Sequence, residues 1–240
     1  MRFAVVQFGG SNCDRDVWHI LQDVCGVSTD LVWYKERLRD QYDAIVIPGG
    51  FSYGDYLRAG AIAARTPIME DIRSHADAGR LVLGICNGAQ IGAESGLVPG
   101  IFTINAYPKF VCDWVHLRVE NTTSPFTSQY RRGEVIRIPI AHKEGRYVAP
   151  PAVLEKLERD NRIAFRFCDP YGVCTPESNP NGSARGITGI LGTRDNILVM
   201  MPHPERASEP VLGSDAGRKI FDSMIHAIAS GSVPCAEEGL

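Results

Sequence analysis

The chain has 240 residues, 44% of them hydrophobic and 22% charged, with a formal net charge of −3. This composition is typical of a globular protein with a substantial core, and the absence of a basic run argues against nucleic acid as a partner. No apolar run approaches the roughly 18 residues of a membrane span, and the apolar part of MRFAVVQFGG is too short for a signal peptide, so we expect a cytoplasmic protein with no membrane partner.

The first hundred residues alternate between short apolar runs and helical segments. The apolar runs predict buried strands at residues 2–8, 28–34, 44–47 and 80–85. The segments between them predict helices at residues 11–24, 56–64 and 67–78, and Ser11 is the expected cap of the first. Strands rich in Val, Ile and Leu that alternate with helices indicate an open, mostly parallel, doubly wound α/β sheet with helices on both faces.

The second half predicts an added antiparallel region. Strand candidates lie close together, some with the alternation of half-exposed strands, at residues 102–107, 111–120, 134–142, 162–167, 186–191 and 196–203. Residues 149–152 and 177–183 are interpreted as loops, and residues 214–230 as a closing helix capped by Ser214. No linker divides the chain, so residues 1–240 are expected to form a single domain.

A cysteine stands where a buried strand meets a helix, in LVLGICNGAQ (81–90). The pattern Gly84-Ile85-Cys86-Asn87-Gly88 is the cysteine form of the G-x-S-x-G nucleophile elbow. Free N–H groups at the start of the following helix favour a thiolate, which is the reactive form. The alternative interpretation is a buried cysteine between glycines that permit close packing. A second thiol, Cys13, also follows a strand but lacks the glycine that should come two residues after the nucleophile.

A cysteine nucleophile needs a base and a group that orients the base. His203 follows a buried strand, and Glu205 lies two residues on, so in an extended segment both side chains point to the same side. The pair His142 and Glu144 has the same spacing and is a second candidate. A zinc site is disfavoured because the P-C-x-x-C pattern of the zinc deaminases is absent, and no metal ligands are predicted.

Acyl transfer also requires donors for an oxyanion. The N–H of Asn87, directly after the nucleophile, is one expected donor. The second is expected from Pro48-Gly49-Gly50-Phe51, because glycine lets a backbone N–H approach a ligand closely. A plain tight turn is the alternative interpretation of this segment.

These residues resemble the class I glutamine amidotransferases, and within them the branch formed by the glutaminase subunits of phosphoribosylformylglycinamidine synthase. The matching stretches are GSNCDRD (10–16), PGGFSYGDYLRAGAIA (48–63), GICNGAQ (84–90), PIAHKEGRY (139–147), NPNGS (179–183) and MPHPER (201–206). The resemblance implies that Cys86 attacks glutamine to form a glutamyl thioester, with His203 as the proton shuttle and Glu205 as its orienter. It also implies Gly50 and Asn87 as the oxyanion donors, Gln90 as a glutamine-binding residue, and His142 in substrate binding or a partner interface.

The resemblance further implies a division of labour in purine biosynthesis. Ammonia would pass to a large synthetase subunit, which uses ATP and Mg²⁺ to make the amidine from formylglycinamide ribonucleotide, and a small accessory subunit would join the complex. This chain would hold no cofactor, which agrees with the absence of an ATP-binding motif. Its glutaminase activity is expected to be low in isolation and to rise when the synthetase docks.

Four alternatives remain open on the sequence alone. The chain could be a glutaminase for another acceptor, or a cysteine hydrolase on the same α/β sheet. It could also be a non-catalytic interaction protein that keeps the fold, or a nucleotide-binding oxidoreductase on a flavodoxin-like sheet.

Overall fold

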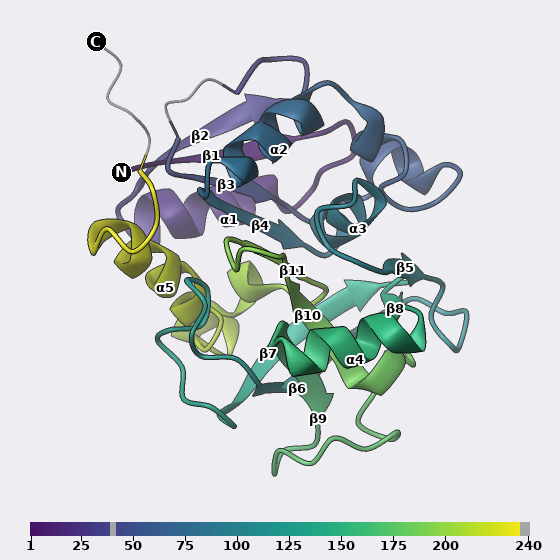
Figure 1. Cartoon of the computed structure of the whole chain (residues 1–240). Coiled ribbons are helices and arrows are strands. Elements are labelled where there is room, and N and C mark those ends of the chain that lie inside the picture. Colours follow the sequence, from purple (N-terminus) through teal and green to yellow (C-terminus); the bar gives the residue numbers. More distant parts are fainter. Residues whose placement is uncertain (39–41, 236–240) are drawn as a thin grey trace.

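The computed structural model describes residues 1–38 and 42–235. A sheet of nine strands runs through this part of the chain in the order β2-β1-β3-β4-β11-β10-β9-β6-β7, and β5 pairs separately with β8 (Figure 1). The strands are β1 (Arg2–Gln7), β2 (Ser28–Trp33), β3 (Ala44–Ile47), β4 (Leu81–Ile85), β5 (Ile101–Thr103), β6 (Val111–Val119), β7 (Val135–His142), β8 (Arg146–Val148), β9 (Ile163–Cys168), β10 (Ile187–Leu191) and β11 (Ile197–Met200). The α-helices are α1 (Asp14–His19), α2 (Ile68–Asp77), α3 (Asn87–Glu94), α4 (Pro151–Arg159) and α5 (Arg218–Ala229).

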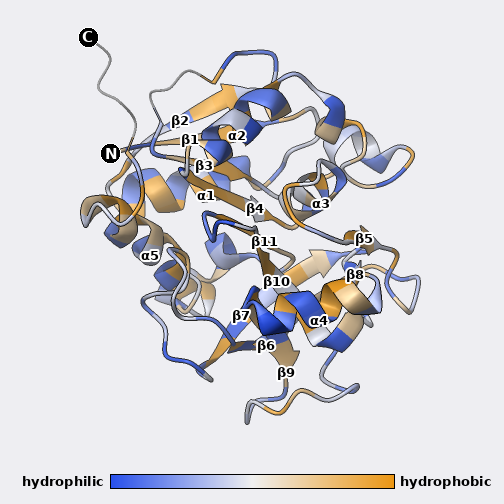
Figure 2. Ribbon diagram, in the orientation of Figure 1, coloured by the Kyte–Doolittle hydropathy of each residue, from blue (hydrophilic) through white to orange (hydrophobic). Residues whose placement is uncertain are grey.

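The first five strands of this order form the parallel part of the sheet. β1 pairs in parallel with β2 and β3, and β4 pairs in parallel with β3 and β11. Every residue of β3, β4 and β11 is buried, and these strands form an apolar layer at the middle of the molecule (Figure 2). α1 joins β1 to β2 and α2 joins β3 to β4 in opposite directions along the sheet, so the right-handed rule for such connections places these two helices on opposite faces. The predicted doubly wound α/β class is therefore confirmed.

The remaining strands extend the same sheet with antiparallel pairing. β10 pairs with β11 and β9, and β6 pairs with β9 and β7, all antiparallel. The predicted antiparallel region is thus confirmed as a continuation of the parallel layer. Among the described residues, no helix is both long and apolar enough to cross a lipid bilayer.

The first helix is shorter and differently capped than predicted. α1 begins at Asp14, passes into a π-helical turn at Ile20–Val24, and has Cys13 at its N-cap without a side-chain hydrogen bond. Ser11 does not cap it, because its hydroxyl accepts a hydrogen bond from the N–H of Phe8 at 3.0 Å. The chain turns back on itself at Gly9-Gly10, so Ser11 closes that turn instead.

The helix predicted at residues 56–64 is wrong. Only the end of this segment is helical, in a 3-10 turn at Ala63–Arg65, and Leu57 has a positive φ of 71°. The preceding 3-10 turn at Ser52–Asp55 also holds positive φ values, 54° at Tyr53 and 53° at Asp55. A residue with a left-handed backbone conformation interrupts an α-helix. This conformation costs free energy in every residue other than glycine, so a single side-chain-bearing residue that adopts it ends the regular helix. The apolar residues whose spacing favoured a helix lie in an irregular segment instead.

Three further boundaries differ from the predictions in the second half. The segment taken as a loop at residues 149–152 begins α4, with Pro151 at the first helical position, where its missing N–H costs nothing. The strand predicted at 102–107 is only the short β5, and its partner β8 was not predicted. Ser214 does not cap α5, which starts at Arg218 with Gly217 at its N-cap.

Candidate active site

Four loops with unusual chemistry meet at one edge of the parallel layer. Cys13 follows β1, Gly49 and Gly50 follow β3, Cys86 follows β4, and His203 follows β11. These strands are neighbours in the sheet, so their carboxyl ends deliver the loops side by side. This is the edge at which open α/β sheets bind ligands.

Cys86 occupies a strained turn between β4 and α3. Its φ of 50° and ψ of −103° lie outside the regions that a non-glycine residue adopts comfortably. The side chain is only 5% exposed, and the Cys86 thiol lies 3.6 Å from the carbonyl oxygen of Ala141 on β7. The geometry of a nucleophile elbow is therefore present at the predicted residue.

The two glycines of the elbow let α3 pack directly onto the sheet. A Cβ atom at Gly84 would lie 2.7 Å from the carbonyl oxygen of Gly88. A Cβ atom at Gly88 would lie 2.0 Å from the carbonyl oxygen of Ile47 on β3. Because real Cβ atoms do not come so close to backbone oxygens, both positions require glycine.

The glycine loop after β3 is tied to the loop after β1. The carbonyl oxygen of Gly49 accepts hydrogen bonds from the N–H groups of Asn12 and Cys13, both at 3.2 Å. A Cβ atom at Gly50 would lie 2.6 Å from the carbonyl oxygen of Gly10, so only glycine fits there. The segment is therefore more than an isolated tight turn, and it holds the backbone of Gly50 close to the nucleophile loop.

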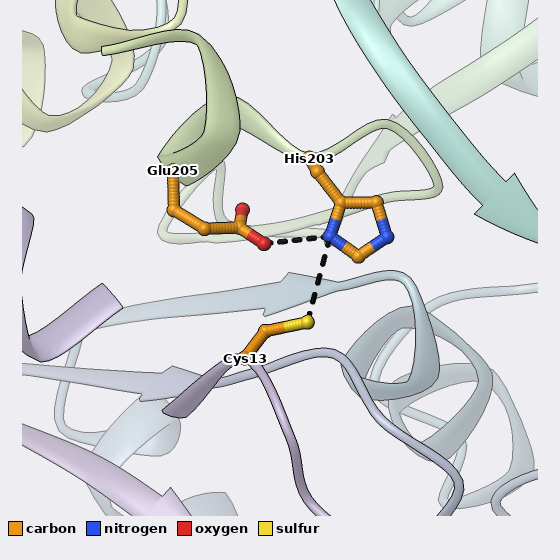
Figure 3. Close-up of side chains that lie close together, drawn as sticks. All are labelled: Cys13, His203 and Glu205. Carbon is orange, nitrogen blue, oxygen red and sulfur yellow. Dashed lines mark hydrogen bonds and ion pairs between the residues drawn. The ribbon is translucent and has the colours of Figure 1, made fainter. Parts of the chain in front are cut away.

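His203 and Glu205 form the predicted pair. Nδ1 of His203 lies 2.6 Å from Oε1 of Glu205, and both side chains are almost completely buried (Figure 3). Because an ionised carboxylate only accepts hydrogen bonds, Nδ1 carries the proton of the neutral ring. That leaves Nε2 as the basic nitrogen, and it has no hydrogen-bond partner among the residues that the structure describes.

Electrostatics favour the protonated form of His203. Burial lowers the pKa of this imidazole, but the charge of Glu205 and the nearby sulfur of Cys86 raise it, and the net result is well above the ordinary value. A Cβ atom at Gly49 would lie 2.8 Å from Cε1 of His203 and 3.4 Å from Cβ of Cys86, so both side chains meet above this glycine. The structure thus brings nucleophile, base and orienter together.

The side chains of Asn87 and Gln90 are both engaged within the protein. The amide of Asn87 accepts from the N–H of Ser52 at 3.2 Å and donates to Gln90 at 2.9 Å. The amide of Gln90 donates to the carbonyl oxygen of Glu144 at 2.8 Å. The backbone N–H of Asn87 stands in the first turn of α3, where helix N–H groups lack intrahelical partners, as an oxyanion donor requires.

His142 lies beneath the site rather than on a surface. It is 3% exposed, and its Nε2 accepts a hydrogen bond from Asn181 at 3.1 Å. Burial is the main reason why the pKa of His142 falls to about 3, so the ring is neutral. The predicted role in a partner interface is not supported, because the side chain does not reach the surface. The second H-x-E pair also fails as a base and orienter, since Glu144 accepts from the N–H of Ala59 instead.

Cys13, which the sequence suggested only as a weaker candidate for the nucleophile, lies directly beside His203 in the structure. Its Sγ lies 3.9 Å from Nδ1 of His203 and 3.0 Å from Nη2 of Arg206. The atoms of Cys13, His203 and Glu205 that could bind a metal ion, one from each residue, all lie within 4.8 Å of one another. The 2.6 Å bond between His203 and Glu205 is nevertheless too short to admit a metal ion between them, because tetrahedral ligands at about 2.1 Å stand more than 3 Å apart. The cluster fits a hydrogen-bonded network and not a metal centre.

Comparison with known proteins gives a consistent result. A family described as "CobB/CobQ-like glutamine amidotransferase domain" matches residues 1–224. Phosphoribosylformylglycinamidine synthase subunit PurQ of Methanosarcina acetivorans is 57% identical over 224 residues, which cover 93% of this chain and 97% of the relative. The protein of the same name from Methanocaldococcus jannaschii is 51% identical over 225 residues, covering 94% and 97%.

Solved structures also match over nearly the whole chain. The structure of PurLQS from Thermotoga maritima contains a chain that is 42% identical, with a TM-score of 0.85 over 95% of this chain and 98% of that one. The glutaminase domain of Trypanosoma brucei CTPS with bound acivicin has a TM-score of 0.59 at 16% identity over 95% and 94% of the two chains, and it shares the fold.

Proposed function

The chain belongs to the CobB/CobQ-like glutamine amidotransferase family, and from that membership and the geometry of the site we propose how it works. It is the glutaminase subunit of phosphoribosylformylglycinamidine synthase and supplies ammonia for purine biosynthesis. The observation that carries the mechanism is the thiol of Cys86, held on a strained backbone beside the buried pair of His203 and Glu205.

The first half-reaction releases ammonia. With the thiol proton already transferred to Nε2 of His203, Sγ of Cys86 bonds to the side-chain amide carbon of glutamine, and the carbonyl electrons move onto oxygen. The N–H groups of Gly50 and Asn87 donate to this oxyanion, each contributing about 3 kcal/mol to its stabilisation. As the oxyanion collapses, the carbon–nitrogen bond breaks and His203 protonates the leaving nitrogen. Ammonia departs, and a glutamyl thioester remains.

The second half-reaction restores the enzyme. His203 removes a proton from water as the water oxygen attacks the thioester carbon. The carbon–sulfur bond then breaks, the sulfur recovers its proton, and glutamate leaves. Glu205 holds Nδ1–H throughout, so the same ring nitrogen faces each reacting group. Gln90 anchors the backbone at Glu144 through its side-chain amide, and its part in binding glutamine stays a prediction.

The remaining steps belong to partner subunits. The chain works with a large synthetase subunit and a small accessory subunit, and PurLQS from Thermotoga maritima is a complex of this kind. We propose that ATP and Mg²⁺ are used only by the synthetase and that this chain binds neither. Equilibrium dialysis of the chain against ATP and Mg²⁺ tests this, and stoichiometric binding would contradict it. A cytoplasmic location is proposed from the substrate pool that such a complex requires.

An electrophilic diazoketone analogue of glutamine tests the nucleophile. The assembled complex is treated with the analogue, and modified peptides are mapped by mass spectrometry. A single adduct on Cys86 that excess glutamine prevents is the expected result. The exposed thiol of Cys112 is an internal control, because modification there would indicate unselective alkylation. An adduct on Cys13 would overturn the assignment.

Loss of the thiol gives the matching kinetic test. Ammonia release from glutamine by the complex is expected to fall by about a thousandfold or more in Cys86→Ala. Cys112→Ala, which removes a thiol away from the site, is expected to retain wild-type activity. Equal activities of Cys86→Ala and Cys112→Ala would contradict the mechanism.

A further inference from the structure

Cys13 is a buried thiol beside the catalytic histidine that the proposed mechanism does not use. It is 1% exposed, and the loop that carries it is fixed to the glycine loop by the paired hydrogen bonds to Gly49. Its Sγ lies 3.0 Å from the position that a Cβ atom at Gly49 would take, so the sulfur borders the same point as His203 and Cys86. A thiol held this firmly next to a proton shuttle requires an explanation.

The proton of this thiol is committed to a neighbour on its own loop. Sγ of Cys13 donates to Oδ1 of Asn12 at 3.1 Å. A thiol has a single proton, so its lone pairs face the other two contacts, Nη2 of Arg206 at 3.0 Å and Nδ1 of His203 at 3.9 Å. Both of those groups are N–H donors. The sulfur is therefore an acceptor toward the guanidinium and toward the imidazole.

The same geometry excludes Cys13 as a second nucleophile. It contacts Nδ1, the protonated nitrogen that Glu205 binds, and not Nε2, which acts as the base (Figure 3). Burial raises the pKa of the Cys13 thiol, although its bond to His203 and the charge of Arg206 act in the opposite direction. A nucleophile needs the reverse environment.

We propose that Cys13 is a positioning residue whose sulfur supplies a second acceptor behind Nδ1 of His203 and stabilises the imidazolium formed during catalysis. The inference rests on the proposed function. Arg206 completes the arrangement, because it reaches both the sulfur and, at 3.9 Å, Oε1 of Glu205. It thus holds the two acceptors of Nδ1–H side by side.

The effect on the acid–base behaviour of His203 follows from its surroundings. The charged and titratable groups that face the imidazole come from several elements and are Glu205, Arg206, Cys13, Asp16, Cys86 and His142. Of these, Glu205, Cys86 and Cys13 raise the pKa of His203. A contact to sulfur stabilises the imidazolium less than the hydrogen bond to the carboxylate does. Removing Cys13 is therefore expected to lower the titration midpoint of His203 by only about half a pH unit.

Histidine Cε1 chemical shifts of the whole chain, followed by NMR against pH, test the proposal. The His203 signal is identified by its loss in His203→Gln. In Cys13→Ala the midpoint is expected to fall by about half a pH unit, and in Cys13→Ser, which retains a smaller acceptor, to fall less. Cys168→Ala is the matched control, since Cys168 is an equally buried thiol on β9, and its midpoint should equal that of the wild type.

The kinetic consequence appears on the alkaline side of the pH profile. The imidazolium must protonate the leaving nitrogen, so the alkaline limb of kcat/KM for ammonia release by the complex should move to lower pH in Cys13→Ala. KM for glutamine should not change, because the sulfur does not contact the substrate. A residue that only fills space would reduce stability without moving this limb.

Each outcome of the His203 titration either supports the proposal or overturns it. If His203 titrates in Cys13→Ala as it does in the wild type, Cys13 is a packing residue and the proposal is wrong. If Cys13→Ala fails to fold, Cys13→Val, which fills the space of the thiol without an acceptor, carries the test, and a His203 midpoint equal to that of the wild type overturns the proposal. The NMR titration does not depend on turnover. Failure of the wild-type complex to release ammonia would therefore refute the proposed function separately.

Discussion

Cys86 shows that a catalytic residue can be held at the expense of stability. A φ of 50° with a ψ of −103° is a conformation that glycine adopts freely and that costs a side-chain-bearing residue about 1–3 kcal/mol. The neighbouring strand and helix hold it there, since the N–H of Cys86 donates to Met200 on β11 at 2.8 Å. The strain keeps the thiol above the sheet edge, where the substrate must bind.

Replacing Cys86 therefore has opposite effects on activity and on stability. Cys86→Gly and Cys86→Ala both remove the thiol and are expected to be inactive. Cys86→Gly also relieves the backbone strain, so its free energy of unfolding should exceed that of Cys86→Ala by about 1 kcal/mol. Urea unfolding of the two variants measures the difference. Equal or reversed stabilities would mean that the elbow is not strained.

His142 links stability to pH because it is buried in the neutral form. Above pH 6.5 this histidine is neutral in both the folded and the unfolded chain. As the pH falls, the unfolded histidine takes up a proton, whereas the folded one does not until its pKa of about 3. Stability is therefore lost as the pH falls through this window, at up to about 1.4 kcal/mol per pH unit.

His142→Gln removes this titration and retains an acceptor for the amide of Asn181. Between pH 6.5 and 4.5 the wild type should lose about 2 kcal/mol more unfolding free energy than the variant. Urea unfolding at several pH values gives both curves. Parallel curves for wild type and His142→Gln would show that the buried ring does not govern acid stability.

The contact between α3 and β3 depends on one glycine. At Gly88 an added Cβ atom would meet the carbonyl oxygen of Ile47 at 2.0 Å, and a backbone oxygen inside a sheet has little freedom to move. Alanine favours a helix by about 1 kcal/mol over glycine, but overpacking costs about 3 kcal/mol. The helix would have to shift, and Cys86 at its start would shift with it.

Gly88→Ala is expected to lower the free energy of unfolding by about 2 kcal/mol and to reduce glutaminase activity. Gly9→Ala is the control, because an added Cβ atom at Gly9 meets nothing within 4 Å. Thermal unfolding and ammonia release are measured for both. Wild-type stability and activity in Gly88→Ala would contradict the close approach of helix and strand.

Elements buried on both faces were the ones that the sequence predicts well. The runs that became β1, β3, β4 and β11 carry continuous apolar residues, and their short length and β-branched residues identify them as strands. Residues 56–64 misled the prediction because their helical spacing is overridden by left-handed residues that only the packing of this loop explains. Pro151 misled it in the other direction, since a proline can begin a helix as well as end one.

The site followed the same division between local and long-range information. The positions of Cys86, His203 and Glu205 were predictable because each sits in a short motif with local geometry. The contacts of Cys13 and Arg206 were not, because these residues are 193 positions apart and only the order of the strands brings them together. Sequence spacing holds no signal for such a pair.

The whole sheet is expected to unfold as one unit, as predicted for a single domain. Trp18 and Trp33 lie in the parallel part and Trp114 lies on β6 in the antiparallel part, and these are the only tryptophans of the chain. Urea unfolding followed by fluorescence in Trp114→Phe reports the first part, and in Trp18→Phe/Trp33→Phe the second. Each midpoint should equal the midpoint of the same variant by far-UV circular dichroism. Separate midpoints would divide the chain into two folding units.

Coupling to the synthetase should be visible at the nucleophile itself. In the chain alone the Cys86 thiol faces the carbonyl oxygen of Ala141, and Nε2 of His203 has no partner among the described residues. The sulfur of Cys86 is close enough to raise the pKa of His203, but Nε2 makes no hydrogen bond of standard geometry among the described residues, which would limit wasteful release of ammonia. Docking of the synthetase is expected to bring the two atoms into contact, a shift that a coupling free energy of about 1–3 kcal/mol suffices to drive.

The rate at which the diazoketone analogue labels Cys86 measures this coupling. Addition of the synthetase and accessory subunits should increase the rate by about tenfold or more, within the range that such coupling free energies produce. An unrelated protein at the same concentration is the control. Because labelling requires only the thiol and its base, an increase locates the switch at Cys86 and His203 and not at ammonia transfer. Equal labelling rates with and without the partners would mean that the free chain is already fully active, and the switch would have to lie elsewhere in the complex.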